Sequence, residues 1–599
     1  MKMIEKIILF ISFLITSISV QANAELEALT LNDNYWTLSN GGYQNLRYSG
    51  LDQINSVNVH RLKVVKKINT GIQGVHAGQP LIIPGKMAHL EHDLLVINTA
   101  FPNKVMAFDL DTFDIEWEYV PEQDEEVVIP HMASFHLSLG LAYVDGKIIL
   151  QQNDTRLVVL NAFDGIVLWS IQNGNPMIGE SNINAPIIVK NMIITGNDGS
   201  EFGVRGNLTA YDINNGQLVW RAYNTGTDDD MLINNNKWSD NDVTTVLGKV
   251  IDRNSSANSW PSKEAYLHGG STTEGWYSYD PELELIYYGT STPGTWNPYQ
   301  RKGDNKWSNS IIARDVNTGV VKWIYQMTPH DSWAYQGTNE MTLVDMEING
   351  KLKKLLVHFD ENGFVYKLDR TNGKLLSADK YNQYANWADR IYLLNGKPIL
   401  NNKVNPGHNG ENIVTKDICP AAVWGSSNKG MSSYHARSKL FFSYINNICM
   451  TFEPVSYAAG GNKFETGKAF VNANLTLYPG AAVYGGGFTH ISEFIAWDPV
   501  NNHIKWSIPE MSLISGGIFS TAGNIAFYGT TNGIFSAIDV ETGDLLWAYE
   551  THSSISGGVS TWMHNKRQYI GLMTGDKDNV SMDYVGGKEG NIYIFSLED

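Results

Sequence analysis

The two cysteines, Cys419 and Cys449, are the first residues whose type and spacing suggest a chemistry. In an oxidising compartment they would form a disulfide that closes a loop of about 30 residues and stabilises the fold by about 3 kcal/mol in the chain-entropy model. Two buried free thiols are the alternative. So few cysteines argue against a metal site built from thiolates.

A histidine and three tryptophans could also take part in chemistry. His330 could ligate a metal, and Trp296, Trp307 and Trp333 could form a box around a cofactor. A hydrogen-bonded structural histidine and tryptophans packed between sheets are the alternatives, and we adopt them as the working interpretation.

The N-terminus has the pattern of a secretory signal. Two lysines precede an apolar run from 7 to 20, and Ala22-Asn23-Ala24 is typical of a cleavage site. The run is too short for a stable membrane span, although a retained N-terminal anchor is the alternative. We expect residues 1–24 to be a cleaved signal peptide, and residues 25–599 to form a single domain in the periplasm.

The formal net charge of −18 at pH 7 limits the partners of this chain. Nucleic acid and anionic lipid are excluded by like-charge repulsion. An acidic exported protein could attract a basic partner such as a small cytochrome c, or its charge could serve solubility alone. The sequence leaves both interpretations open.

One pattern recurs along the chain and must position any site. A small or apolar residue is followed by Asp or Asn two residues on, in most copies by Gly four residues later, and by Trp after four more. The Asp or Asn would start a turn, Gly would supply a positive φ, and Trp would open the next strand and wedge between sheets. The Asp or Asn positions are Asp109, Asn161, Asp212, Asp315, Asp369, Asp498 and Asp539.

The spacing of these copies predicts an all-β, eight-bladed β-propeller with tryptophan-docking-type blade repeats. The first three copies are about 50 residues apart, one blade length. The longer gap after Asp212 fits two blades with one degenerate copy, and the gap after Asp369 fits two blades plus an excursion that holds both cysteines. The last strand, 591–597, is expected to meet the N-terminal part in one sheet. A seven-bladed WD-type propeller is the alternative.

Stretches between the repeats resemble the calcium- and lanthanide-dependent quinoprotein methanol dehydrogenases. These stretches are Glu201-Phe-Gly-Val-Arg-Gly206, Gly275-Trp-Tyr-Ser-Tyr-Asp-Pro281, Gly303-Asp-Asn-Lys-Trp307, Thr328-Pro-His-Asp331, Leu356-Val-His-Phe-Asp360, Leu368-Asp-Arg-Thr-Asn-Gly373, Asp417-Ile-Cys-Pro420 and Ile448-Cys-Met450. The resemblance runs from about Tyr35 to the C-terminus. It implies an eight-bladed propeller with a central funnel, and a homodimer by analogy.

The resemblance also implies a cofactor site in the funnel. In that family, pyrroloquinoline quinone (PQQ) lies between a tryptophan and a disulfide of adjacent cysteines, and it ligates calcium or a lanthanide together with Glu, Asn and Asp side chains. Glu201 matches the metal-binding glutamate. Thr272 and Asn446 match residues that contact PQQ.

Most of the other positions depart from the family pattern. The catalytic base position holds Ala334, the ligand asparagine is Thr292, and the further aspartate of lanthanide enzymes is Gln336. The stacking tryptophan is Glu274, and the arginine beside the quinone is Glu361. Asp331 does not replace the base if 331–334 is an extended strand, because side chains three residues apart then point to opposite faces.

These departures predict a site without PQQ and without a metal of the family type. Calcium takes 6–8 oxygen ligands, and Glu201 supplies only two of them. Carboxylates at 274 and 361 would repel a tricarboxylate such as PQQ. Glu201, Glu274 and Glu361 could instead hold a cation in the funnel, or they could remain solvated there.

Two functions follow from this sequence. The first is a non-catalytic binding, assembly or regulatory paralogue in the periplasm, acting through an unknown protein partner. The alternative is a divergent, active PQQ- and metal-dependent alcohol (methanol) dehydrogenase that passes electrons to a cytochrome c.

Overall fold

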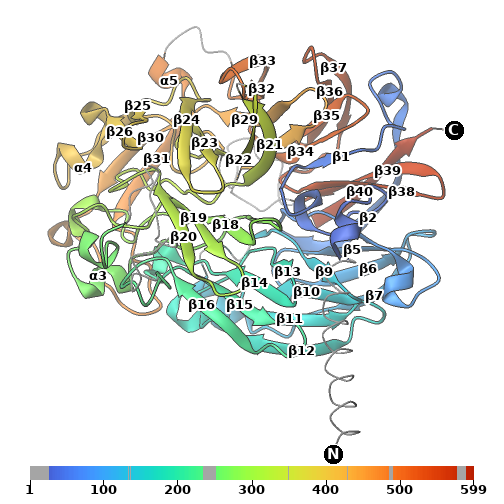
Figure 1. Ribbon diagram of the computed structural model, residues 1–599, viewed down its shortest axis with the longest axis horizontal. Helices are drawn as coiled ribbons and strands as arrows, with labels where there is room; N and C mark the ends of the chain where they lie inside the picture. The colour runs from blue at the N-terminus through green and yellow to red at the C-terminus, as the bar shows by residue number, and fades with distance from the viewer. Residues whose placement is uncertain are drawn as a thin grey trace, which may run out of the picture.

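The computed structural model describes residues 26–132, 134, 137–233, 251–348, 350–427, 430–484, 490–575 and 589–598. The predicted signal peptide, residues 1–24, lies outside the described residues. Within them, strands dominate, and four-stranded antiparallel sheets follow one another around a central axis in chain order (Figure 1). The prediction of an all-β propeller is confirmed.

The first four sheets are formed by consecutive strands. They are β4 (Leu81–Ile83), β5 (Leu94–Asn98), β6 (Val105–Asp109) and β7 (Ile115–Tyr119); β9 (Ala142–Val144), β10 (Lys147–Gln151), β11 (Arg156–Asn161) and β12 (Val167–Gln172); β13 (Ile187–Val189), β14 (Met192–Gly196), β15 (Asn207–Asp212) and β16 (Leu218–Tyr223); and β17 (Tyr277–Asp280), β18 (Leu285–Gly289), β19 (Ser310–Asp315) and β20 (Val321–Gln326).

Four further sheets complete the ring among the described residues. They are β21 (Met341–Ile348), β22 (Lys351–Phe359), β23 (Phe364–Asp369) and β24 (Lys374–Lys380); β28 (Ser433–His435), β29 (Leu440–Asn446), β32 (Ser492–Asp498) and β33 (His503–Glu510); β34 (Ile514–Thr521), β35 (Ile525–Thr530), β36 (Ile534–Asp539) and β37 (Leu545–Glu550), with β1 (Tyr48–Ser49) parallel to β34; and β38 (Val559–His564), β39 (Arg567–Thr574), β40 (Glu589–Leu597) and β2 (Leu62–Gln73).

The two ends of the described chain close the ring. Strand β2, near the N-terminus, pairs antiparallel with β40, so that Leu62 lies opposite Leu597. The expected pairing of the last strand with the N-terminal part is therefore confirmed.

The two long gaps between repeats were interpreted wrongly. The sheets that carry Asp212 and Asp315 are consecutive, and so are those that carry Asp369 and Asp498. Inserted segments lengthen both gaps, and among the described residues neither gap holds a further four-stranded sheet. The second gap holds two inserted segments. The first, between β24 and β28, contains the pair β25 (Ala388–Tyr392) and β26 (Lys397–Leu400) and the strand β27 (Thr415–Ile418). The second, between β29 and β32, contains β30 (Ile448–Pro454) and β31 (Ala473–Pro479), which form one sheet with β27.

The predicted disulfide joins the two inserted segments to each other. Cys419 follows β27, Cys449 lies in β30, and the two are bonded. Both residues are buried, and neither is a free thiol. The disulfide prediction is confirmed.

Helices are short and lie in the connections. They are α2 (Glu125–Val128), α3 (Lys263–Leu267), α4 (Pro406–Asn409), α5 (Ala481–Tyr484), and the 3₁₀ turns η1 (Ser39–Gly41), η2 (Val59–Arg61), η3 (Gly85–Ala88), η4 (Ile129–His131), η5 (Pro176–Ile178), η6 (Ser200–Phe202), η7 (Ala257–Ser259), η8 (Pro298–Gln300), η9 (Asn402–Val404) and η10 (Tyr457–Ala459). Over the described ranges, no helix has the length and apolar character needed to cross a bilayer.

The repeat builds the contacts between neighbouring sheets. In each copy the Asp or Asn ends a strand, and its side chain accepts from the backbone N–H two residues on, as Asp315 does from Asn317 at 3.1 Å. The Trp of one sheet donates its indole N–H to the carbonyl that follows the Asp or Asn of the next sheet. The donor–acceptor pairs are Trp117–Ala162, Trp169–Ile213, Trp220–Val316, Trp323–Arg370 and Trp506–Val540.

The segment from Asn34 to Arg47 runs along the start of the sheets and positions the centre. Its backbone or side chains form hydrogen bonds with every sheet of the ring or its edge. Their partners, in chain order, are Ile82, Leu141, Ile188, Tyr279, Leu343, Tyr434, Ser520 and Met563. One short peptide therefore ties the sheets together around the axis.

Candidate active site

The predicted site residues lie on connections at one end of the sheets. Within each sheet the first two strands are antiparallel, so the start of the first lies beside the end of the second. Thr272 and Glu274 precede β17, and Thr292 follows β18. Ala334 precedes β21, and Glu361 follows β22. The topology therefore gathers these positions at the same end of neighbouring sheets.

A chain of buried hydroxyl groups joins three of these connections. The Ser200 Oγ lies 2.7 Å from the Thr272 Oγ1 and 3.3 Å from the Ser291 Oγ. The Thr292 Oγ1 donates to the Asp331 Oδ2 at 3.4 Å. All five side chains are buried. Ser200, Thr272 and Ser291 thus form one group of hydroxyls, and Thr292, the residue after Ser291, forms a pair with Asp331. We call these two groups together the polar cluster.

Asp331 is the carboxylate at the end of this cluster. Its Oδ1 accepts from the backbone N–H of Trp333 at 2.9 Å. Burial raises the pKa of Asp331 to about 6, against the lowering effects of Arg301 and the Asn309 amide. A carboxyl group with such a pKa can accept a proton near neutral pH.

The expectation that Asp331 points away from the site is wrong. Residues 327–340, between β20 and β21, do not form a strand. His330 and Ala334 have positive φ values of 48° and 63°, so the alternation of an extended strand does not apply. The turn brings the Asp331 carboxylate to Thr292 instead.

Ala334, at the expected base position, has no acid–base function. Its methyl group is buried in an apolar cluster with Trp333, Tyr335 and Trp387. The indole of Trp333 donates to the Val404 carbonyl at 2.8 Å, which fits the packing role expected for it. Any proton acceptor here must come from another residue.

The carboxylates at 274 and 361 are buried rather than solvated. Glu361 accepts from the backbone N–H of Gln336 at 2.8 Å. The pKa of Tyr335 is raised by burial and then by the charges of Asp331 and Glu361. The Asp331 and Glu361 carboxylates therefore both lie near the Tyr335 phenol. Burial and then Glu274 raise the pKa of Tyr277. The alternative that these side chains are solvated is wrong for Glu274 and Glu361.

Glu201 and Asn446 differ in what they offer to a ligand. Glu201 lies in η6, is half-buried, and its backbone carbonyl accepts from Phe470 at 2.6 Å. The Asn446 amide is engaged on both sides by the backbone of Ile514, at 3.0 and 3.1 Å. Asn446 therefore shapes the site through the β29–β34 contact.

The sequence reasoning missed Ser200, Arg301 and Asn309. The Arg301 guanidinium is buried and donates to the Asp331 carbonyl, and the Asn309 amide acts on the Asp331 carboxyl. A signal for the latter two was present, because they flank the Gly303–Trp307 stretch already singled out. Their roles depend on a fold-back that sequence spacing does not reveal.

The backbone around the cluster is strained. Ser271, Asn309, His330 and Ala334 have φ values between 45° and 63°. Non-glycine residues in this region cost about 1–3 kcal/mol each and concentrate at functional sites, where surrounding structure holds them. This strain supports a function for the cluster. His330 itself faces the Gly303 carbonyl at 2.7 Å, as a structural histidine would.

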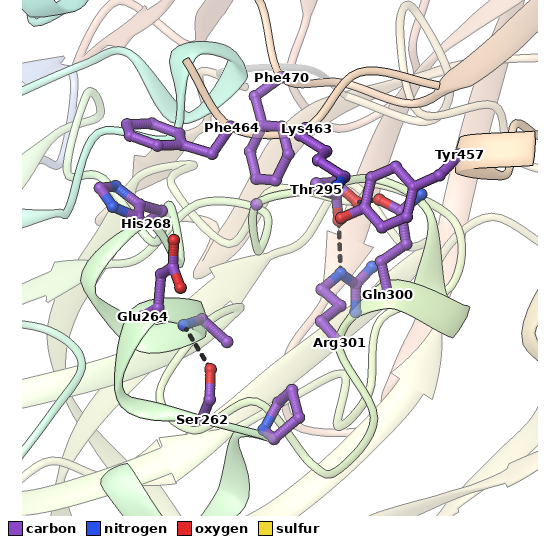
Figure 2. Close-up of a pocket in the computed structure, with 13 residues that line it drawn as sticks. Ser262, Glu264, His268, Thr295, Gln300, Arg301, Tyr457, Lys463, Phe464 and Phe470 are labelled. Carbon is purple, nitrogen blue, oxygen red and sulfur yellow. Dashed lines mark hydrogen bonds between the residues drawn. The ribbon is translucent and has the colours of Figure 1, made fainter. Parts of the chain in front are cut away.

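A cavity of about 500 Å³ lies beside the cluster. Figure 2 shows Glu264 and His268 on one side and Tyr457 and Lys463 on another, with Phe464 stacked on His268 at 3.5 Å between ring centroids. Its wall includes Gly294 and Thr295, which directly follow the Thr292 segment, and Arg301. The cavity thus borders the polar cluster through the 292–301 connection.

The chain is similar in sequence and structure to known proteins. Residues 36–378 and 496–570 match the β-propeller domain of the PQQ glucose/ethanol/alcohol dehydrogenases. The lanthanide-dependent methanol dehydrogenase of Methylorubrum extorquens is 42% identical over 539 residues, 89% of this chain and 85% of that protein. Methanol dehydrogenase [cytochrome c] subunit 1 of Methylobacterium organophilum is 36% identical, over 96% of this chain and 88% of that protein.

A solved structure agrees with these matches. A europium-containing methanol dehydrogenase superposes with a TM-score of 0.87 at 35% identity, over 96% of this chain and all of that chain. The expectation that the chain carries no cofactor is contradicted, because relatives over most of its length are named as lanthanide-dependent and the matching family is named for PQQ.

Proposed function

The chain belongs to the PQQ-dependent alcohol dehydrogenase family, and we propose that it is a divergent oxidoreductase that acts on the CH–OH group of an alcohol. The observation that carries this proposal is the buried Asp331 carboxylate, which accepts a hydrogen bond from the Thr292 hydroxyl one residue from the Ser200–Ser291–Thr272 group of hydroxyls. Thr292 stands at the position that the resemblance assigns to the ligand asparagine, and Asp331 precedes the expected base position, Ala334, by three residues. The names of the relatives support methanol or another small alcohol as substrate.

Glu201, Thr292 and Asp331 are the side chains whose chemical types suit a hard cation. They provide carboxylate and hydroxyl oxygens, which calcium and lanthanides prefer. When bound, the cation would polarise the alcohol oxygen, and the quinone would accept the two electrons. The positions that the resemblance assigns to the quinone fit less well, because Glu274 and Glu361 add buried negative charge. A trivalent lanthanide would offset more of that charge than calcium.

Asp331 is the proton acceptor in this proposal. An alcohol held at Thr292 would pass its hydroxyl proton to the Asp331 Oδ2, directly or through the Thr292 hydroxyl. The pKa of Asp331, raised to about 6 by burial, leaves it ionised at pH 7 yet basic enough to take the proton. The Trp333 N–H binds the Asp331 carboxylate, and Arg301 binds the Asp331 backbone carbonyl.

A second function remains for a specific reason. The methyl group of Ala334 fills the expected base position within an apolar cluster, which favours a non-catalytic binding, assembly or regulatory paralogue. In that case the surface of the propeller, and an unknown periplasmic partner, would carry the function.

The finer predictions about the molecule belong to the same proposal. Each of the eight sheets would be one blade of a single domain, residues 25–599, with the Trp–carbonyl contacts as docking between blades. Export would follow cleavage of residues 1–24. An active enzyme would pass its electrons to a cytochrome c, as the name of one relative suggests, and the family analogy favours a homodimer.

Reconstitution of the purified protein with PQQ and either lanthanum or calcium tests the two functions. Alcohol-dependent dye reduction, and its loss by about 10²-fold or more in Asp331→Asn, is expected for the oxidoreductase. Asp154→Asn is the matched control, because burial also raises the pKa of Asp154, in the β10–β11 turn. Absence of dye reduction with every cofactor pair would contradict the enzyme and leave the binding paralogue.

A further inference from the structure

A histidine and two carboxylates converge on the first sheet, in a cluster separate from the candidate active site. His92 lies on the connection between β4 and β5, Asp109 ends β6, and Glu116 lies in β7. The His92 Nε2 is 3.2 Å from the Glu116 Oε1, and its Nδ1 is 3.8 Å from the Asp109 Oδ2. One ligand atom from each of the three lies within 4.8 Å of the others.

The fold preforms these donors. The Asp109 Oδ1 is used by the repeat turn, where it accepts from the backbone N–H of Asp111 at 2.6 Å, so the rigid turn leaves Oδ2 facing His92. The His92 Nε2 has no exposed surface, and its 3.2 Å contact with the Glu116 Oε1 does not have the geometry of a hydrogen bond. The three side chains are 16–32% exposed, accessible to an ion yet partly desolvated.

The charge around the cluster is unbalanced. Asp93 and Asp111 flank the same sheet, and both face His564 of the β38–β39 turn, at 3.7 and 2.7 Å. Within the described part of the chain, no lysine or arginine forms an ion pair with any of these four carboxylates. Among the described ion pairs, the imidazoles of His92 and His564 are the groups that can offset these four negative charges.

Another copy of the repeat provides an internal comparison. Asp315 is the equivalent of Asp109, and Lys322, which precedes Trp323 as Glu116 precedes Trp117, lies 3.8 Å from its Oδ2. There an ion pair neutralises the strand end without help. In the first sheet two like charges occupy the same places, with an imidazole between them.

We propose that His92, Asp109 and Glu116 bind a divalent transition metal of the zinc class, with water as a further ligand. One imidazole and two carboxylates with a remaining open position are a donor set that zinc takes, at about 2.0–2.2 Å from each ligand. Imidazole among the donors favours zinc, copper or nickel over calcium and magnesium. Ligands at these distances from a tetrahedral ion lie about 3.4 Å apart, so the present separations of up to 4.8 Å require the side chains to close by as much as about 1.4 Å. This site does not depend on the proposed oxidoreductase function.

The metal would also strengthen the closure of the ring. It would tie the β4–β5 connection to β6 and β7, next to the Asp111–His564 contact that joins the first sheet to the last. Because a ligand that binds only the folded state stabilises it by mass action, zinc should raise the melting temperature of the protein.

The test is zinc and cobalt titration of the full mature protein without a histidine tag, followed by calorimetry and by the visible bands of bound Co²⁺. We expect the wild type to bind one more equivalent than His92→Gln, or to bind it at least tenfold more tightly. Glu116→Lys, which copies the Asp315–Lys322 pair, should lose the same equivalent of metal. Its new ion pair should preserve the fold, so it serves as the test if His92→Gln does not fold.

The matched control is His490→Gln. His490 lies 3.0 Å from the Glu493 carboxylate and belongs to no group of three potential metal ligands among the described residues, so its removal should leave the titration unchanged. Equal stoichiometry and affinity, within twofold, in the wild type, His92→Gln and Glu116→Lys would overturn the proposal. The cluster would then be a set of histidine–carboxylate ion pairs only.

Discussion

The repeat turns and the central cluster are built on the same sheets but follow different rules. At a turn, each side chain satisfies its neighbours within a few residues, and Trp323 then reaches one carbonyl of the next sheet. In the cluster, Ser200 meets Ser291 and Thr292 meets Asp331, each pair from separate connections that the ring of sheets brings together. Because Ser200, Thr292 and Asp331 lie outside the strands, they form none of the pairings that build the sheets. We therefore expect the scaffold to tolerate their replacement.

Removal of a buried tryptophan that bonds to the next sheet should have the largest effect. Trp323→Ala should lower the free energy of unfolding by about 3–5 kcal/mol, because Trp323 is 1% exposed and both its ring contacts and its bond to Arg370 are lost. Urea unfolding followed by circular dichroism measures this. Trp547→Ala, at a half-buried copy, should cost clearly less. Equal losses would mean that burial does not set the strength of the docking contact.

Removal of the disulfide measures how much a cross-link between the inserted segments stabilises the protein. Replacing both Cys419 and Cys449 by Ser should lower the stability by about 3–4 kcal/mol, as the chain-entropy model predicts for a closed loop of 30 residues. Differential scanning calorimetry of the variant, and of the wild type under a reducing agent, should give the same loss. A loss in the variant alone would point to the serines and not to the cross-link.

Asp331→Asn should have the opposite sign and raise the free energy of unfolding at neutral pH. The pKa of Asp331 is raised to about 6 in the folded state, so the stability it contributes is present below pH 4 and is lost as the pH rises to about 6. Above pH 6 the buried carboxylate costs about 3 kcal/mol, which the amide would recover.

Urea unfolding between pH 4 and pH 8 measures this effect. The gap between Asp331→Asn and the wild type should open between pH 4 and pH 6 and then stay constant. Asp114→Asn, at an exposed turn residue, is the control and should show no such gap. A variant that is less stable than the wild type at pH 7 would contradict the raised pKa.

The smallest expected effect separates backbone strain from packing at the turns. Gly373 has a φ of 74°, and a Cβ there would lie 2.6 Å from the Trp323 ring. Gly350 has a φ of 72° and open space around it. Gly350→Ala should therefore cost about 1 kcal/mol from strain alone, and Gly373→Ala about 1–3 kcal/mol more from overpacking. Equal melting temperatures would mean that the tryptophan moves aside at no cost.

The outer scaffold was the part most open to prediction from sequence. The Asp or Asn, Gly and Trp positions have short-range roles, so their spacing predicted turns and strand ends that the structure confirms. The long gaps were misinterpreted because an insertion and a degenerate sheet have the same length in sequence. The central residues were predicted by position, yet the direction of the Asp331 side chain was not, since the turn after β20 departs from extended backbone.

The sequence by itself determined the all-β repeat, the disulfide pair and the family to which the chain belongs. Those properties depend on local hydrogen bonding, on cysteine chemistry and on matching motifs, which a linear pattern carries. Only the tertiary structure decided that Thr292 meets Asp331, that Glu361 is engaged by a backbone amide, and that His92 lies between Asp109 and Glu116. The reason is physical: these contacts form between connections far apart in sequence, and ring closure sets their distances.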